Sequence, residues 1–213
     1  MLFRSDRRGR LLIVGLAPGL HGANATGRPF TGDHAGILLY EVLHLLGIAS
    51  TSQSIDASDG LRLNDCRITN AVKCLPPQNK PIVAEITACN PYLAAELKAV
   101  PAGGVIVALG RIAHHAIAKA LSLKLASIPF GHGTEYDLPD GRRLVSSYHC
   151  SRYNTQTRRL TTTRPESIRK KTKKGFEGRT RPSVVVRPSS SVRRPSVVRP
   201  SSSVRRRPSS SSV

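Results

Sequence analysis

The chain has 213 residues, enough for one domain with a hydrophobic core, and 39% of them are hydrophobic. Its 33 basic and 13 acidic residues give a formal net charge of +20, which favours a polyanionic partner, nucleic acid before membrane. No apolar run of about 18 residues occurs, and MLFRSDRRGR at the start has no apolar core. Both facts argue against a membrane span and a signal peptide, so we expect a protein of the cytoplasm, or of wherever its DNA or RNA lies.

The composition changes near residue 165. Residues 166–213 consist mostly of Arg, Lys, Pro, Ser and Val, repeat the tripeptide Arg-Pro-Ser, and hold 14 basic but only 2 acidic residues. Such a segment lacks the apolar bulk to offset the entropy of ordering. We predict a globular domain at 1–165 and a basic disordered tail at 166–213.

The first predicted elements alternate between strand and helix. LLIVG (11–15) is a short apolar run ended by glycine, which is typical of a strand buried on both faces of a parallel sheet. After a glycine-rich loop, apolar residues at helical spacing predict a helix over 34–46. RITNAVK (67–73) is the next predicted strand.

The second half continues the same alternation. A helix is predicted from about Val83 to Val100, with a kink at Pro91. GVIVALG (104–110) is the clearest buried strand, and a helix over roughly 111–121 follows it.

A hairpin is predicted near the end of the domain. TEYDL and RRLVSSYH flank Pro139-Asp140-Gly141, and the second strand is expected to end at His149. The alternation predicts an α/β layered domain with a mostly parallel sheet. Ligands of such sheets bind beyond the carboxyl ends of the strands, which is where the loops after Gly15, Lys73 and Tyr148 would lie.

Three segments are therefore expected at one edge of the sheet. They are GLAPGLHGANATGRPFTGD (15–33), ITNAVKCLPPQNKP (68–81) and YHCSRYNTQTRRLT (148–161). In order and spacing they resemble the uracil-DNA glycosylase superfamily, and within it family 5, whose first motif is similar to GLAPAAHGANRTGRxFTGD. The resemblance covers residues 11 to 161 and implies a three-layer α/β/α fold.

The chemistry of base release defines what the pocket must contain. The base must leave the stack before its glycosidic bond can be reached. The pocket then needs an apolar face for stacking, hydrogen-bonding groups for the base edge, and stabilisation of the anionic leaving base. A carboxylate can orient the attacking water and counter the cationic sugar.

Phe30 and Asp33 each allow two interpretations. Phe30 could anchor its loop to the core, but the resemblance implies that it stacks on uracil. Asp33 precedes a predicted helix and could cap it. The resemblance implies that Asp33 handles the water, and capping is compatible with that role.

The remaining pocket residues follow from the other segments. Asn70 lies late in a buried strand, where its amide is costly unless it is satisfied, and the resemblance implies that it reads uracil. His149 is implied to donate to uracil O2, although a histidine at a strand end is usually structural. The backbone N–H groups of the turn after the first predicted strand are expected to be a second source of donors to the base. These groups belong to Gly15, Leu16 and Ala17.

The loop after His149 is implied to enter the minor groove and fill the hole left by the flipped base. A plain polar surface loop is the alternative. The DNA-contacting candidates are Arg152, Tyr153 and Asn154 for insertion, with Arg158 and Arg159 on phosphates.

The cysteines are Cys66, Cys74, Cys89 and Cys150, too few and too irregularly spaced for a secreted disulfide framework. By themselves they are open to a metal-binding or a plainly buried role. Families 4 and 5 hold a 4Fe-4S cluster with four cysteines, and the resemblance implies that Cys74 and Cys89 are two of these ligands. The upstream pair is missing, so the cluster is absent, completed elsewhere, or completed by sequence upstream. We favour a truncated or decayed copy.

The resulting prediction is a monofunctional uracil-DNA glycosylase that hydrolyses the N-glycosidic bond of uracil, with other deaminated bases as further candidates. It would act as a monomer on uracil-containing DNA, with no membrane, no nucleotide cofactor and no lysine Schiff base. The alternative is a catalytically impaired remnant that only binds nucleic acid. A small-molecule hydrolase using Asp33 or Ser151 is a third hypothesis, weakened because no G-x-S-x-G motif is present.

Overall fold

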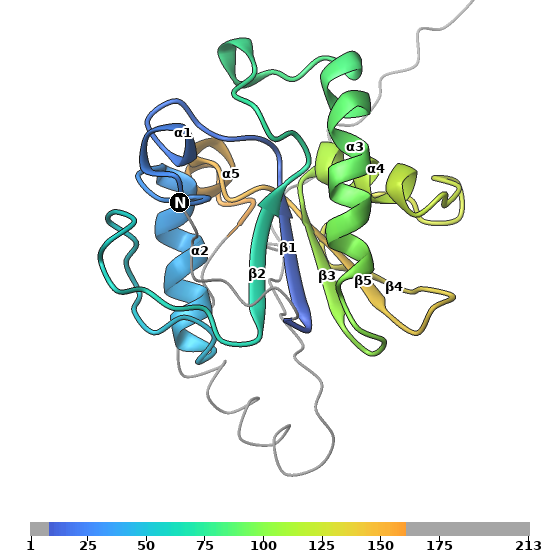
Figure 1. The fold of residues 1–213 in the computed structure, drawn as a ribbon, viewed down its shortest axis with the longest axis horizontal. Coiled ribbons are helices and arrows are strands. Elements are labelled where there is room, and N and C mark those ends of the chain that lie inside the picture. Colours follow the sequence, from blue (N-terminus) through green and yellow to red (C-terminus); the bar gives the residue numbers. More distant parts are fainter. Residues whose placement is uncertain (1–8, 161–213) are drawn as a thin grey trace, which may run out of the picture.

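The computed structural model describes residues 9–160, which form one layered domain (Figure 1). The predicted tail at 166–213 lies outside these residues. A single sheet has the order β2-β1-β3-β5-β4. Its strands are β1 Leu11–Gly15, β2 Cys66–Asn70, β3 Val105–Leu109, β4 Thr134–Asp137 and β5 Arg143–Ser147.

Four of the five strands run parallel, and only the edge strand β4 is antiparallel, to β5. The parallel register places Gly15 opposite Asn70 at the carboxyl ends of β1 and β2. Strand β2 ends at Asn70, earlier than the predicted 73, although the N–H of Ala71 still donates to the Gly15 carbonyl at 2.9 Å. The edge strand β2 and its neighbour β1 therefore deliver these two residues side by side.

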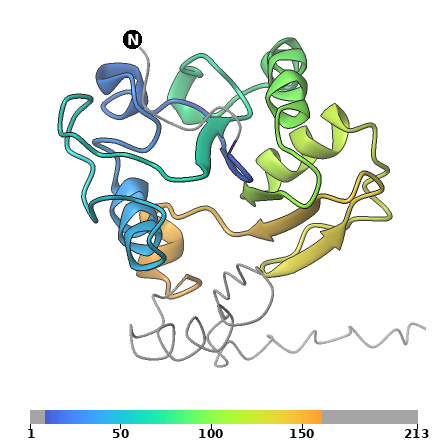
Figure 2. The same cartoon turned by 60° about the horizontal axis from the view of Figure 1, so that its bottom comes forward.

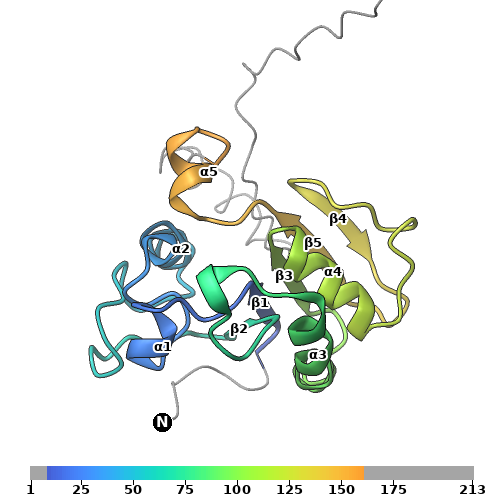
Figure 3. The ribbon, with the colours of Figure 1, turned by 90° about the horizontal axis from the view of Figure 1, so that it is seen from above.

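Helices cover both faces of the sheet (Figure 3). On one face, α3 Val83–Lys98 and α4 Arg111–Ala120 pack on a core that includes Leu12 and Val14. On the other face, α2 His34–Leu45 packs on a second core that includes Ile13. Alternate residues of β1 thus serve opposite cores, and the predicted three-layer α/β/α fold is confirmed.

The structure adds three short helical segments where loops were expected. They are α1 Ala23–Thr26, the 3₁₀ turn Pro77–Asn79 and α5 Arg152–Gln156. Each is too short to show an apolar period, so no pattern could have indicated it. The blue α2 and the orange α5 lie side by side, as Figures 2 and 3 both show.

Two other expectations need adjustment. The hairpin forms as predicted, but β5 ends at Ser147, so His149 lies beyond the strand and not at its end. Helix α3 ends at Lys98, two residues before the predicted end at Val100, and contains Pro91 within it. Among residues 9–160, no helix is long and apolar enough to cross a membrane.

His114 is a fully buried histidine that joins three parts of the domain. From α4, its Nδ1 lies 2.8 Å from Ser146 Oγ on β5, and its Nε2 lies 2.7 Å from the Ile128 carbonyl. Because that carbonyl can only accept, Nε2 carries the proton and Nδ1 accepts from the serine hydroxyl. Burial lowers the pKa of His114.

Acid should therefore destabilise the fold through His114. As pH falls through the ordinary histidine range, the unfolded chain binds a proton that the folded chain resists, so the free energy of unfolding decreases. Denaturant unfolding at pH 8 and pH 5.5 should show a smaller pH dependence in His114→Gln than in the unchanged chain. The exposed-site control His44→Gln should keep the full dependence. Equal pH dependence in all three would contradict the assignment.

Candidate active site

Gly15, Phe30 and Asn70 meet at the carboxyl ends of β1 and β2. A methyl group built on Gly15 would lie 2.5 Å from Asn70 Oδ1 and 2.6 Å from Phe30 Cζ. Those separations are shorter than real side-chain contacts, so no residue larger than glycine fits at position 15 without displacing a neighbour. Two of the three predicted segments, 15–33 and 68–81, thus converge on one point.

Asn70 Oδ1 is buried and has no hydrogen-bond partner among the described residues. A buried acceptor without a donor costs about 1–3 kcal/mol, so such an atom usually has a reason to be kept. Its position against Gly15 and the Phe30 ring leaves it suited to accept from an N–H of a ligand that enters there.

The backbone of Asn70 is fixed by an ion-pair network that the sequence did not suggest. Lys73 Nζ donates to the Asn70 carbonyl at 2.8 Å, to Thr69 Oγ1 at 2.8 Å and to Glu96 Oε2 at 2.5 Å. Arg67 also donates to Glu96, at 2.9 Å. Helix α3 therefore supports the end of β2 through one carboxylate.

Phe30 has a left-handed backbone, with φ of 61°. Its side chain is buried in the core beneath α2, so it does anchor its loop. The same ring reaches Gly15 at one edge and lies 5.9 Å from the His149 ring, centroid to centroid, with 32° between the planes. Gly36 allows this placement, since a methyl group there would overlap the Phe30 carbonyl oxygen.

His149 lies two residues beyond β5 and contacts the turn at Gly110, where an added methyl group would lie 3.4 Å from its Cβ. Burial lowers the pKa of His149, so its imidazole is neutral near pH 7 and keeps one N–H to donate. Its carbonyl accepts from Asn154 Nδ2 at 2.7 Å.

Asp33 occupies the residue before α2, but its side chain makes no capping hydrogen bond. The carboxylate instead lies against Gly19 and Gly22, where an added methyl group on either would clash with it. Burial raises the pKa of Asp33, and the charge of nearby His21 partly offsets that rise. The carboxylate is thus left unengaged by the helix that follows it.

The predicted DNA-contacting residues lie on or after α5. Arg152, Tyr153, Arg158 and Arg159 are exposed, and the Arg159 guanidinium lies over the Tyr153 ring at 5.1 Å. Asn154 differs, because its amide donates to the His149 carbonyl and supports the loop from inside. A contact between His34 Nε2 and Thr155 Oγ1, at 3.2 Å, ties α5 to the start of α2.

The four cysteines fall into two places. Cys89 on α3 is buried, and its Sγ accepts from the N–H of Lys73 at 3.3 Å. Lys73 directly precedes Cys74, which is exposed. Cys66 and Cys150 belong to the core on the other face, where burial raises the pKa of each thiol to about 12. Within residues 9–160, no group of three or more His, Cys, Asp or Glu side chains could hold a metal ion.

Sequence reasoning did not find the supports of the site, namely Lys73, Glu96, His34, Arg28 and Asp59. Arg28 lies inside the motif that carries the family resemblance, so it could have been singled out. Glu96 and Asp59 lie in segments without any motif, and only the fold brings them to the site.

Comparison with known proteins agrees with the arrangement. Residues 3–173 match the family model described as "Uracil DNA glycosylase superfamily". A type-5 uracil-DNA glycosylase of Thermus thermophilus is 50% identical over 156 residues, covering 73% of this chain and 71% of the relative. One of Mycobacterium bovis is 46% identical over 171 residues, covering 79% and 64%. A type-4 enzyme of Archaeoglobus fulgidus is 36% identical over 148 residues, covering 68% and 66%.

The titration of Asp33 tests the electrostatics of the site. The carboxyl should titrate above the ordinary aspartate value, and His21→Gln should raise its pKa further because it removes a nearby positive charge. Carbon-detected NMR of labelled aspartate carboxyls measures both values. His44→Gln, at the other end of α2, is the control and should leave Asp33 unchanged. A midpoint at or below the ordinary value in the unchanged chain would refute this account.

Proposed function

This chain belongs to the uracil DNA glycosylase superfamily, whose type-5 enzymes are among its relatives, and we propose that it is a monofunctional uracil-DNA glycosylase. It would hydrolyse the N-glycosidic bond of uracil in DNA and leave an abasic site. It would act in the cytoplasm, or wherever its DNA is kept.

One observation carries this proposal: beside Gly15 and the Phe30 ring, the buried oxygen of Asn70 has no hydrogen-bond partner within residues 9–160. Uracil presents an N3–H donor next to the O4 acceptor, which match the oxygen and the amino group of an asparagine amide. Cytosine presents the reverse pattern at these two atoms and would leave the Asn70 oxygen facing another acceptor. The geometry thus favours uracil, because cytosine would place two buried hydrogen-bond acceptors against each other.

Phe30 supplies the apolar face on which the extruded base stacks. The lack of a side chain at Gly15 lets the ring and the amide pack close together, so that one base can contact both. Together these groups hold the base out of the duplex while its glycosidic bond breaks.

His149 and the turn after β1 would stabilise the leaving base. As the glycosidic bond breaks, negative charge accumulates on the pyrimidine. The remaining N–H of the neutral imidazole can donate a hydrogen bond to O2 and stabilise that charge. Backbone N–H groups of Gly15, Leu16 and Ala17 are the proposed second source of donors.

Asp33 would act on the sugar side. Its carboxylate is not used as a helix cap and can orient a water toward the anomeric carbon. The same negative charge counters the cationic character of the sugar in the transition state. Because burial raises its pKa, the water-activating form should be lost at a higher pH than for an ordinary aspartate.

A hydrolytic route is also favoured over a lysine Schiff base. Lys73 is the lysine bonded to the base-reading segment, and all three donors of its ammonium are engaged, one by Glu96. An ion-paired ammonium is not a nucleophile. Water oriented by Asp33 is the nucleophile in this proposal.

The exposed face of α5 is the proposed DNA contact, with Arg152 and Tyr153 entering the duplex and Arg158 and Arg159 on phosphates. Asn154 is assigned a supporting role because its amide is committed to the His149 carbonyl.

The residues present do not fit a four-thiolate cluster. Cys74 and Cys89 could supply two ligands, but Cys66 and Cys150 are buried in the opposite core. The proposed reaction uses no step that requires such a group.

Substitution of the two catalytic candidates tests the function. Asp33→Asn and His149→Ala should each slow uracil release from an oligonucleotide by about 100-fold or more while DNA binding persists, because each removes transition-state stabilisation. Single-turnover cleavage and a binding titration measure these effects. Full activity in both variants would defeat the assignment. DNA binding without any release by the unchanged chain would favour the binding-only alternative.

Gly15→Ala tests the pocket itself. The added methyl group should displace Asn70 or Phe30 and reduce uracil release by about 100-fold or more, since a small misplacement at a reacting centre is costly. Gly104→Ala is a matched control, because its methyl group would lie 2.6 Å from Val100 Cγ1, just before β3 and so at the amino ends of the parallel strands. Thermal unfolding of both variants controls for lost stability. Equal losses of activity in the two would argue against a special role for residue 15.

A further inference from the structure

We propose that the buried ion pair of Arg28 and Asp59 is a positioning device for Phe30, so that the connection between α2 and β2 controls base excision without touching the substrate. The inference rests on the proposed function for the role of Phe30. It goes further by assigning a task to residues 54–61, which carry no motif.

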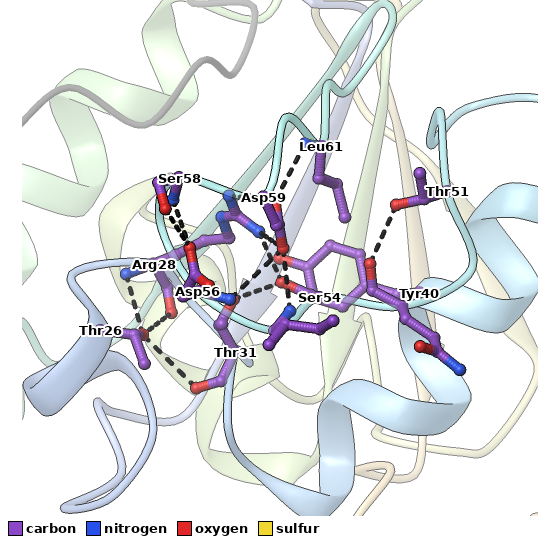
Figure 4. A network of polar contacts seen from close by, with 12 residues as sticks. Thr26, Arg28, Thr31, Tyr40, Thr51, Ser54, Asp56, Ser58, Asp59 and Leu61 are labelled. Atoms are coloured by element: carbon purple, nitrogen blue, oxygen red, sulfur yellow. Dashed lines mark hydrogen bonds and ion pairs between the residues drawn. The ribbon is translucent and has the colours of Figure 1, made fainter.

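Arg28 is 2% exposed and is held from two directions (Figure 4). Its two terminal nitrogens donate to the two carboxylate oxygens of Asp59, each at 2.8 Å, and one of them also donates to Ser54 Oγ at 2.8 Å. A bidentate pair of this kind fixes orientation as well as distance.

Asp59 is itself fixed as an anion. It accepts from the backbone N–H of Ile55 at 2.8 Å and of Leu61 at 2.9 Å. Hydrogen bonding from Arg28 holds the pKa of this carboxyl far below its usual range. The segment from 54 to 61 is thus folded around the carboxylate that receives Arg28.

The residues on both sides of Phe30 are tied to this network or to α2 (Figure 4). Thr31 Oγ1 lies 2.5 Å from Ser54 Oγ, and the Tyr40 hydroxyl donates to the Pro29 carbonyl at 2.8 Å. Thr26 Oγ1 donates to the Arg28 carbonyl at 3.2 Å. Phe30 is therefore clamped at its neighbours on both sides.

The clamp is needed because Phe30 has a backbone conformation that a phenylalanine rarely adopts. A left-handed bulky residue persists only where its surroundings over-determine it. When the clamp loosens, Phe30 can return to a negative φ, and that rotation moves its ring away from Gly15 and Asn70. Buried ion pairs are weak evidence for stability, and fixing one geometry is their better-supported use.

The test is a double-mutant cycle between the clamp and the ring. Asp59→Asn should slow single-turnover uracil release by about 10-fold or more in the unchanged background. In a Phe30→Ala background the same substitution should slow it by about twofold or less, because the ring that it positions is gone. Ser54→Ala is the milder variant for use if Asp59→Asn does not fold. Asp137→Asn breaks an exposed ion pair to Arg143 on the β4–β5 hairpin and is the matched control.

A second readout separates this proposal from the proposed function. With fluorinated phenylalanine incorporated, the ¹⁹F signal of residue 30 should shift or broaden in Asp59→Asn and Ser54→Ala, and stay unchanged in Asp137→Asn. Equal slowing by Asp59→Asn in both backgrounds would overturn the proposal, and so would an unchanged ¹⁹F signal. Absence of uracil release in the unchanged chain, with the ¹⁹F response present, would refute the function and leave the clamp supported.

Discussion

The site depends on glycine at position 15, because Asn70 and Phe30 pack so close to its backbone that any side chain there would clash with them. The parallel register of β1 and β2 brings Asn70 to the same level, and the Phe30 ring packs against the same residue. An amide oxygen and an aromatic ring meet across bare backbone, in a space that any Cβ would fill. In the proposed reaction, the base would meet the amide with its edge and the ring with its face.

The two walls of the pocket are supported from different layers. Asn70 is held through Lys73 by Glu96 of α3, on one face of the sheet. Phe30 is held by Arg28, Asp59 and the core beneath α2, on the other face. Each wall has its own ion pair, so the spacing between amide and ring is set by the sheet that separates the layers. The amide and the ring are thus held by two separate ion pairs, each between residues distant in sequence.

The sequence predicted the sheet well because its central strands are unbroken apolar runs with glycine stops, as at Leu11–Gly15. It also pointed to Asn70, since an amide in a buried strand is costly unless it forms hydrogen bonds. The end of β5 and the three short helical segments were beyond prediction, because they depend on a few backbone hydrogen bonds and have no period. The supports of the site were also beyond prediction. Glu96 reaches Lys73, and Asp59 reaches Arg28, through contacts that only the folded chain creates.

The unequal exposure of the cysteines makes the chain chemically asymmetric. Cys66, Cys89 and Cys150 are buried, and burial keeps the first and last of these protonated and slow to react. Cys74 alone among the four is exposed, four residues after Asn70. An alkylating dye would therefore mark one position, close to the end of β2. A fluorophore attached there would report the arrival of DNA from a site that the reaction does not use.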